Sequence, residues 1–130
     1  MILAFVGCSS EPEIRKNVDF VEWLPGNASE ISYYSRDGFG WFRFAEGTMA
    51  EENFRSFAAS NGWDLEEKEN VSVNMRSVLG EPPLREVQEG IEMDMVRDAL
   101  VYEDRKPNGG GITWVFDRET DRFYFNESHR

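Results

Sequence analysis

The chain has 130 residues, with 14 basic and 25 acidic side chains and a formal charge of −11 at pH 7. This length suits one domain, 10 Phe, 4 Tyr and 4 Trp argue against disorder, and the negative charge argues against nucleic-acid binding. One cysteine and one histidine exclude an intramolecular disulfide and any multi-cysteine or multi-histidine metal site, and we expect no cofactor.

The amino terminus is apolar and leads into the single cysteine. The segment Phe5-Val6-Gly7-Cys8 resembles the lipobox of bacterial lipoproteins, with Phe5 where Leu is usual. The resemblance implies cleavage before Cys8 and lipidation of Cys8, which would anchor the protein to a membrane of the bacterial cell envelope. Only seven residues precede Cys8, and none is basic, so we interpret them as a truncated signal peptide and expect the gene product to begin upstream.

The alternative for this segment is a short first strand with a buried thiol. The lipobox interpretation is favoured because the cysteine is unique and its flank turns abruptly polar. We therefore expect residues 1–18 to be a signal remnant and tether, and residues 19–130 to form a single α+β domain.

The sequence pattern in the first part of that domain predicts a β-hairpin. Residues 19–24 fit either a short helical turn or an edge strand. Residues 31–36 and 39–45 are rich in strand formers, and Asp37-Gly38 between them is a favoured two-residue turn.

We expect the two faces of the second hairpin strand to have different roles. Phe42 and Phe44 alternate onto one face, which we expect to lie in the core. Phe39, Trp41 and Arg43 share the other face, and exposed aromatic patches are typical of binding surfaces.

A helix is predicted over residues 48–61. Thr48 and Glu51 have the spacing of a capping box, and Asn61-Gly62 is a typical left-handed stop. Between them, four apolar residues recur at helical spacing: Ala50, Phe54, Phe57 and Ala58.

The acidity of the chain is concentrated in its middle. Residues 64–104 carry 4 basic and 12 acidic side chains, so we expect a solvated or partner-facing region there. Residues 63–69 predict an extended segment, and residues 71–75 alternate like a strand. The following apolar spacing fits either a helix or a charged loop, and involves Leu84, Val87, Ile91 and Met95.

The carboxyl third predicts three strands, over residues 99–104, 112–117 and 122–126. The glycine-rich loop at 108–111 leads into a strand rather than a helix, which argues against a phosphate site and predicts a hairpin loop with a positive φ. His129, next to the last residue of the sequence, is expected to lie in a solvated terminus.

Together these elements predict an α+β fold, with an antiparallel sheet of about five strands and one main helix, residues 48–61, packed on one face. We find no catalytic constellation and expect no enzymatic activity. The possible binding surface consists of six residues: Phe39, Trp41, Arg43, Arg105, Lys106 and Asn108.

The sequence therefore predicts a small acidic, envelope-anchored lipoprotein that acts as a non-enzymatic binding or interaction module with a protein partner. The alternative is a soluble, cytoplasmic immunity-type or inhibitor-type protein that binds a basic protein partner. In that case the acidic surface would steer association.

Overall fold

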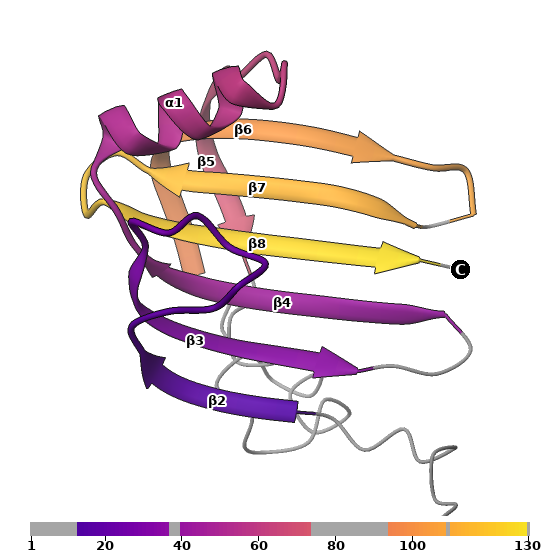
Figure 1. Cartoon of the computed structure of the whole chain (residues 1–130). Coiled ribbons are helices and arrows are strands. Elements are labelled where there is room, and N and C mark those ends of the chain that lie inside the picture. The colour runs from indigo at the N-terminus through magenta and orange to yellow at the C-terminus, as the bar shows by residue number, and fades with distance from the viewer. Residues whose placement is uncertain (1–12, 37–39, 74–93, 109, 130) are drawn as a thin grey trace, which may run out of the picture.

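The computed structural model of the chain describes residues 13–36, 40–73, 94–108 and 110–129. These residues form one antiparallel sheet in the order β2-β3-β4-β8-β7-β6-β5, with one helix (Figure 1). The strands and the helix are β2 (Glu13–Val18), β3 (Ser29–Arg36), β4 (Trp41–Thr48), α1 (Glu51–Ser60), β5 (Glu66–Val73), β6 (Asp94–Arg105), β7 (Gly111–Asp117) and β8 (Arg122–His129).

The fold is mostly β, so the predicted α+β class, with about five strands and one main packed helix, is wrong. The strands predicted over residues 31–36, 39–45, 99–104, 112–117 and 122–126 correspond to β3, β4, β6, β7 and β8. β5 lies in the two segments predicted to be extended or strand-like, 63–69 and 71–75, whereas β2 was not predicted. β2 and β5 form the edges of the sheet. Both edge strands consist mainly of charged and polar residues. Charges protect the unpaired backbone groups of an edge from pairing with another chain, and they also remove the apolar alternation that reveals a strand.

The sheet begins at Glu13, inside the segment predicted as a tether. β2 pairs with β3 through a register that shifts between Arg15 and Val18, and Asn17 in the bulge has a φ of 55°. A bulge of this kind also discourages edge-to-edge pairing. Residues 19–24, for which a helical turn and an edge strand were the two alternatives, instead form a loop with turns between β2 and β3.

The helix is shorter than predicted, and its start differs. α1 begins at Glu51 with Ala50 as N-cap and no side-chain capping bond, because Thr48 still belongs to β4 and its hydroxyl lies 3.1 Å from that of Ser29. The predicted capping box is therefore wrong. The predicted stop is confirmed, since Asn61 is the C-cap and Gly62 follows with a φ of 72°.

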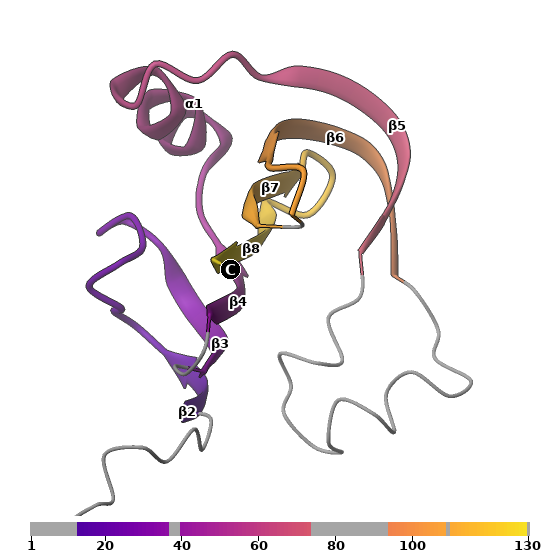
Figure 2. The same ribbon diagram turned by 90° about the vertical axis from the view of Figure 1, so that its right-hand side faces the viewer.

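The main core lies between the sheet and the elements on one face, which we call the helix face. Phe54 of α1 is fully buried and stacks on Phe116, with ring centroids 5.0 Å apart. The loop between β2 and β3 lies on the same side of the sheet as α1 (Figure 2). Buried residues of this core are Val21, Leu24, Ala28, Ile31, Tyr33, Ala45, Met49, Phe54, Leu100, Trp114, Phe116, Phe123 and Phe125.

The opposite side of the sheet, the far face, carries a smaller apolar cluster. β5 and β6 curve toward this face (Figure 2), and their Val73 and Val96 pack with Val115 of β7. Phe44 is half-buried against this cluster, and Phe42 is half-buried and stacks on Tyr34. The predicted core residues of β4 thus lie on the far face, away from the main core.

Two connections show how backbone geometry sets the turns. Arg36 pairs with Phe42, so the β3–β4 connection is longer than the predicted two-residue turn; residues 37–39 lie outside the described residues. At the start of β7, Gly111 has a φ of 128°, and a Cβ there would collide with the carbonyl oxygen of Asp104. The positive φ predicted for the glycine-rich loop is therefore confirmed at Gly111.

Candidate binding surface

Among the described residues, α1 and the 19–28 loop cover only part of the helix face (Figure 1). Figure 1 shows α1 and the 19–28 loop over the ends of β7 and β8 that lie away from the carboxyl terminus. Toward the carboxyl terminus, a row of residues in register crosses the sheet from β3 to β6: Ser35, Arg43, Glu127, Ile112 and Asp104. None of these five side chains is fully buried, and we call them, together with Trp41 and His129 in the adjacent row, the open half.

Arg43 occupies the centre of the open half, between two tryptophans. Its guanidinium carbon lies 4.8 Å from the ring centroid of Trp23 and 4.6 Å from that of Trp41. The Nε atom of Arg43 is buried without a hydrogen-bond partner. Two indole rings therefore hold a cation in place through cation–π attraction and leave part of its donor capacity unused.

Glu127 lies directly opposite Arg43 on the neighbouring strand, but its polar contact is with a different residue. Its Oε2 lies 3.2 Å from Nε2 of His129, and the imidazole stacks on Trp41 with centroids 4.1 Å apart. The Glu127 side chain is only 18% exposed. His129 thus connects the carboxylate to the aromatic stack at the end of β8.

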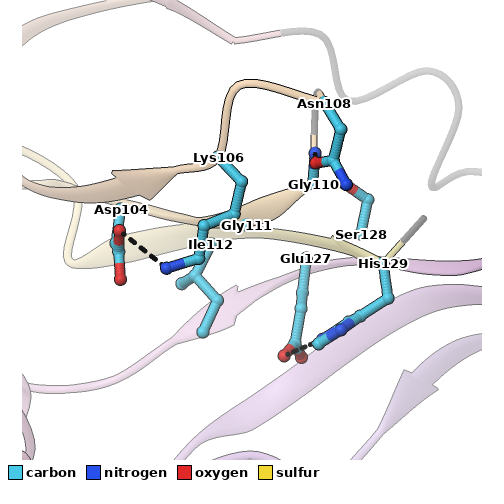
Figure 3. Close-up of a pocket in the computed structure, with 9 residues that line it drawn as sticks. All are labelled: Asp104, Lys106, Asn108, Gly110, Gly111, Ile112, Glu127, Ser128 and His129. Atoms are coloured by element: carbon cyan, nitrogen blue, oxygen red, sulfur yellow. Dashed lines mark hydrogen bonds and ion pairs between the residues drawn. The ribbon is translucent and has the colours of Figure 1, made fainter.

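A shallow pocket of about 200 Å³ borders the open half beside the β6–β7 loop (Figure 3). Lys106 Nζ lies 3.5 Å from Asp104 Oδ1 on its floor, and the Asn108 side-chain oxygen accepts a hydrogen bond from Gly110 N. The pocket is lined by Asp104, Lys106, Asn108, Gly110, Gly111, Ile112, Glu127, Ser128 and His129. The loop and the end of β8 therefore contribute to one concave site.

A second shallow pocket, of about 340 Å³, lies at the other end, beside Trp23. Phe20 is 65% exposed there, and Arg15 Nε lies 3.5 Å from Glu13 Oε2. The pKa of Tyr33, which also lines this pocket, is raised above its usual value. The main cause is burial of the side chain, and the second is its hydrogen bond with Glu13. From β3 to β6, the open half spans about 19 Å, which is four strand spacings of ~4.8 Å.

The predicted binding residues are divided between the two faces. Trp41, Arg43, Lys106 and Asn108 come together at the open half and its pocket. Arg105 is on the far face, where its guanidinium donates to Asn126 Oδ1, Ser128 Oγ and Thr113 Oγ1. Successive residues of a strand point to opposite faces, so Arg105 lies on the face opposite to that of Asp104. Phe39 and Cys8 lie outside the described residues.

Sequence reasoning missed five of the seven residues of the open half, and it also missed Trp23, which lies over Arg43. The five are Ser35, Asp104, Ile112, Glu127 and His129. His129 was expected in a solvated terminus, but β8 continues to His129, which pairs with Trp41. Extending the apolar–polar alternation of residues 122–126 to the end of the chain would have placed Glu127 and His129 on one face. Nothing in the sequence placed Trp23 over Arg43.

Some acidic side chains of residues 64–104 form ion pairs within the fold. Arg118, at the end of β7, lies within 3.6 Å of carboxylate oxygens from three elements: Glu51 of α1, Glu67 of β5 and Asp98 of β6. The hydrogen bond from Arg55, together with the charge of Arg118, lowers the pKa of Glu51. Part of the acidity of residues 64–104 therefore balances a structural arginine.

The neighbouring side chains of Ser128 and His129 at the end of β8 diverge. Ser128 and His129 point to opposite sides of β8 (Figure 3), so these neighbours cannot form a nucleophile–base pair with each other. Within the described ranges, no cluster of three or more His, Cys, Asp or Glu side chains could hold a metal ion. The same ranges contain no helix of the length and apolarity needed to cross a membrane.

Comparison of the chain with protein-family models, with curated proteins and with solved structures gives no match.

Proposed function

We propose that this protein is a non-enzymatic binding module that recognises a protein partner through the open half of its helix face. The observation that carries this proposal is Arg43, which lies against Trp23 and Trp41 at the centre of the open half. Tryptophan and arginine are the residue types most enriched among the side chains that dominate binding energy at protein interfaces. A sheet floor with half-buried aromatics and a polar rim matches the composition of such interfaces.

We further propose that lipidation of Cys8 presents this module at a membrane of the bacterial envelope. The support is the lipobox-like sequence Phe5-Val6-Gly7-Cys8, followed by a polar segment before the sheet begins at Glu13. Each buried methylene of an acyl chain adds about 0.8 kcal/mol to membrane binding, so several chains on one residue give stable anchoring. The open half would then be free to meet a partner at the membrane surface.

The partner interface can be tested by photo-crosslinking in intact cells. A photoreactive phenylalanine derivative at Asp104, on the rim of the open half, should give a crosslink to one recurrent partner peptide, identified by mass spectrometry. The same probe at Met95, which is 53% exposed on a different part of the sheet, is the matched control. Loss of the crosslink in Trp41→Ala would support the proposal, and equal crosslinking from both positions would refute it.

The anchor is tested separately, by metabolic labelling of the full-length product with palmitate. The label should be present in the wild type and absent in Cys8→Ala, and an unlabelled wild-type protein would refute the lipoprotein proposal. The binding proposal would then apply to a soluble protein of the immunity or inhibitor type.

A further inference from the structure

Among the charged residues of the cross-strand row, Arg43 is the one that forms no ion pair or hydrogen bond with another described residue. The row continues through Ser35 to Glu13 on β2, so it contains three carboxylates and one arginine. Glu13 pairs with Arg15, and Asp104 pairs with Lys106. Glu127 Oε2 lies 3.2 Å from His129 Nε2, whose ring is charged only when protonated. Arg43 contacts only the two indole rings.

The position of the guanidinium limits how an anion can approach it. Nε is buried, so a ligand cannot use the side of the fork that includes Nε. The two terminal nitrogens remain, and together they match the spacing of the two oxygens of a carboxylate. Because two indole rings lie against the guanidinium, little side-chain entropy would be lost when a ligand binds.

We propose that Arg43 is a carboxylate-binding subsite, in which the terminal nitrogens of its guanidinium take up one carboxylate group of the partner in an end-on, bidentate pair. This inference rests on the proposed binding function, because it assigns chemistry to the centre of the same surface.

Glu127 makes the proposal sharper, because its carboxylate competes with the ligand. It faces Arg43 across the β4–β8 pair and is held away by His129. Removing the negative charge of Glu127 should therefore improve binding of a carboxylate, whereas a residue that only supported the fold would not have this effect. The overall charge of −11 adds a general repulsion, so recognition depends on this local geometry.

The test uses the full chain and small probes of known chemistry. The carboxylate could come from a chain terminus, an acidic side chain or an acidic sugar, represented by N-acetylalanine, N-acetylglutamic acid α-amide and glucuronic acid. The neutral control is N-acetylalanine amide. Binding is followed by NMR, through the Arg43 Nε–H signal and the indole N–H signals of Trp23 and Trp41.

The acids should shift these signals saturably and the neutral amide should not, and the tightest acid identifies the source of the carboxylate. Arg43→Gln should weaken binding at least about ten-fold, and Glu127→Gln should tighten it about five-fold. Equal shifts with the neutral amide, unchanged affinity in Arg43→Gln, or unchanged or weaker affinity in Glu127→Gln would overturn the proposal. The Glu127 variant retains the Arg43 stack and keeps the test decisive if Arg43→Gln does not fold.

The two proposals fail in different ways. A crosslink from position 104 that survives in Arg43→Gln, with no response to the acid probes, overturns the carboxylate subsite and leaves the binding module supported. Acid probes that bind as described, without any crosslink in cells, support the subsite and overturn the assignment of a protein partner.

Discussion

Arg43 and Glu127 face each other on β4 and β8, yet the carboxylate of Glu127 lies against His129 and the guanidinium of Arg43 lies between two tryptophans. Opposite charges placed directly across two strands would ordinarily stabilise the pair by a few tenths of a kcal/mol or more. Arg43 and Glu127 do not form such an ion pair. The cation at the centre of the open half is thereby left available.

His129→Ala should allow Glu127 to pair with Arg43. Without the imidazole, the nearest cation for the Glu127 carboxylate is the guanidinium across the strand pair. We expect a shifted Arg43 Nε–H NMR signal in the free protein and weaker binding of N-acetylalanine. Lys106→Gln is the matched control, because it frees Asp104 two strands further along the row. An unchanged Arg43 signal in His129→Ala would contradict this account.

Gly111→Ala should destabilise the fold by about 2 kcal/mol or more, because the position combines a positive φ with a Cβ that would collide with the Asp104 carbonyl oxygen. Gly26→Ala is the control, since a Cβ there meets nothing within 4 Å, and its effect should stay within about 0.5 kcal/mol. Chemical denaturation of both variants measures the difference. Similar free energies of unfolding would show that the β6–β7 turn tolerates a side chain.

Phe54→Ala should cost about 3–5 kcal/mol, because this fully buried ring is the contact by which α1 stacks on Phe116. Phe20→Ala removes the same side chain from a position that is 65% exposed, and should change the free energy of unfolding by less than about 0.5 kcal/mol. Thermal and denaturant unfolding followed by circular dichroism distinguish the two. A small effect at Phe54 would mean that the short helix contributes little to the core.

The carboxyl group of Glu51 should titrate higher when its arginine partners are removed. Its pKa is lowered first by the hydrogen bond from Arg55 and also by the charge of Arg118, so Arg55→Gln should raise it more than Arg118→Gln. An NMR pH titration of the Glu51 side-chain carbon measures both. Arg97→Gln is the control, because Arg97 pairs with Glu119 and should leave Glu51 unchanged.

The direction of the pH effect on stability follows from the same shift. Because the pKa of Glu51 is lowered on folding from its usual 4.5, its contribution to stability is present above that pH and is lost as the pH falls through the lower folded value. Arg55→Gln should therefore narrow the difference in unfolding free energy between pH 7 and pH 3. A difference as large as in the wild type would argue against the ion pair as its source.

The sequence by itself determined the central strands, because each of them is rich in aromatic or branched side chains over five or more residues. It also determined the end of the helix at Asn61-Gly62 and the need for a positive φ in the glycine-rich loop. These features depend on residues that are close along the chain. Local steric preferences and apolar periodicity are sufficient to specify them.

Only the tertiary structure decided the rest. β2 is a strand because β3 offers it backbone partners, and its charged side chains conceal this in the sequence. Pairing with β6 joins the two separately predicted segments around residue 70 into the single edge strand β5. The face on which each candidate residue lies depends on register, which separates Arg105 from Trp41 and Arg43 and brings His129 onto Trp41. The binding surface is therefore a product of strand pairing between segments more than 80 residues apart, which local sequence patterns do not encode.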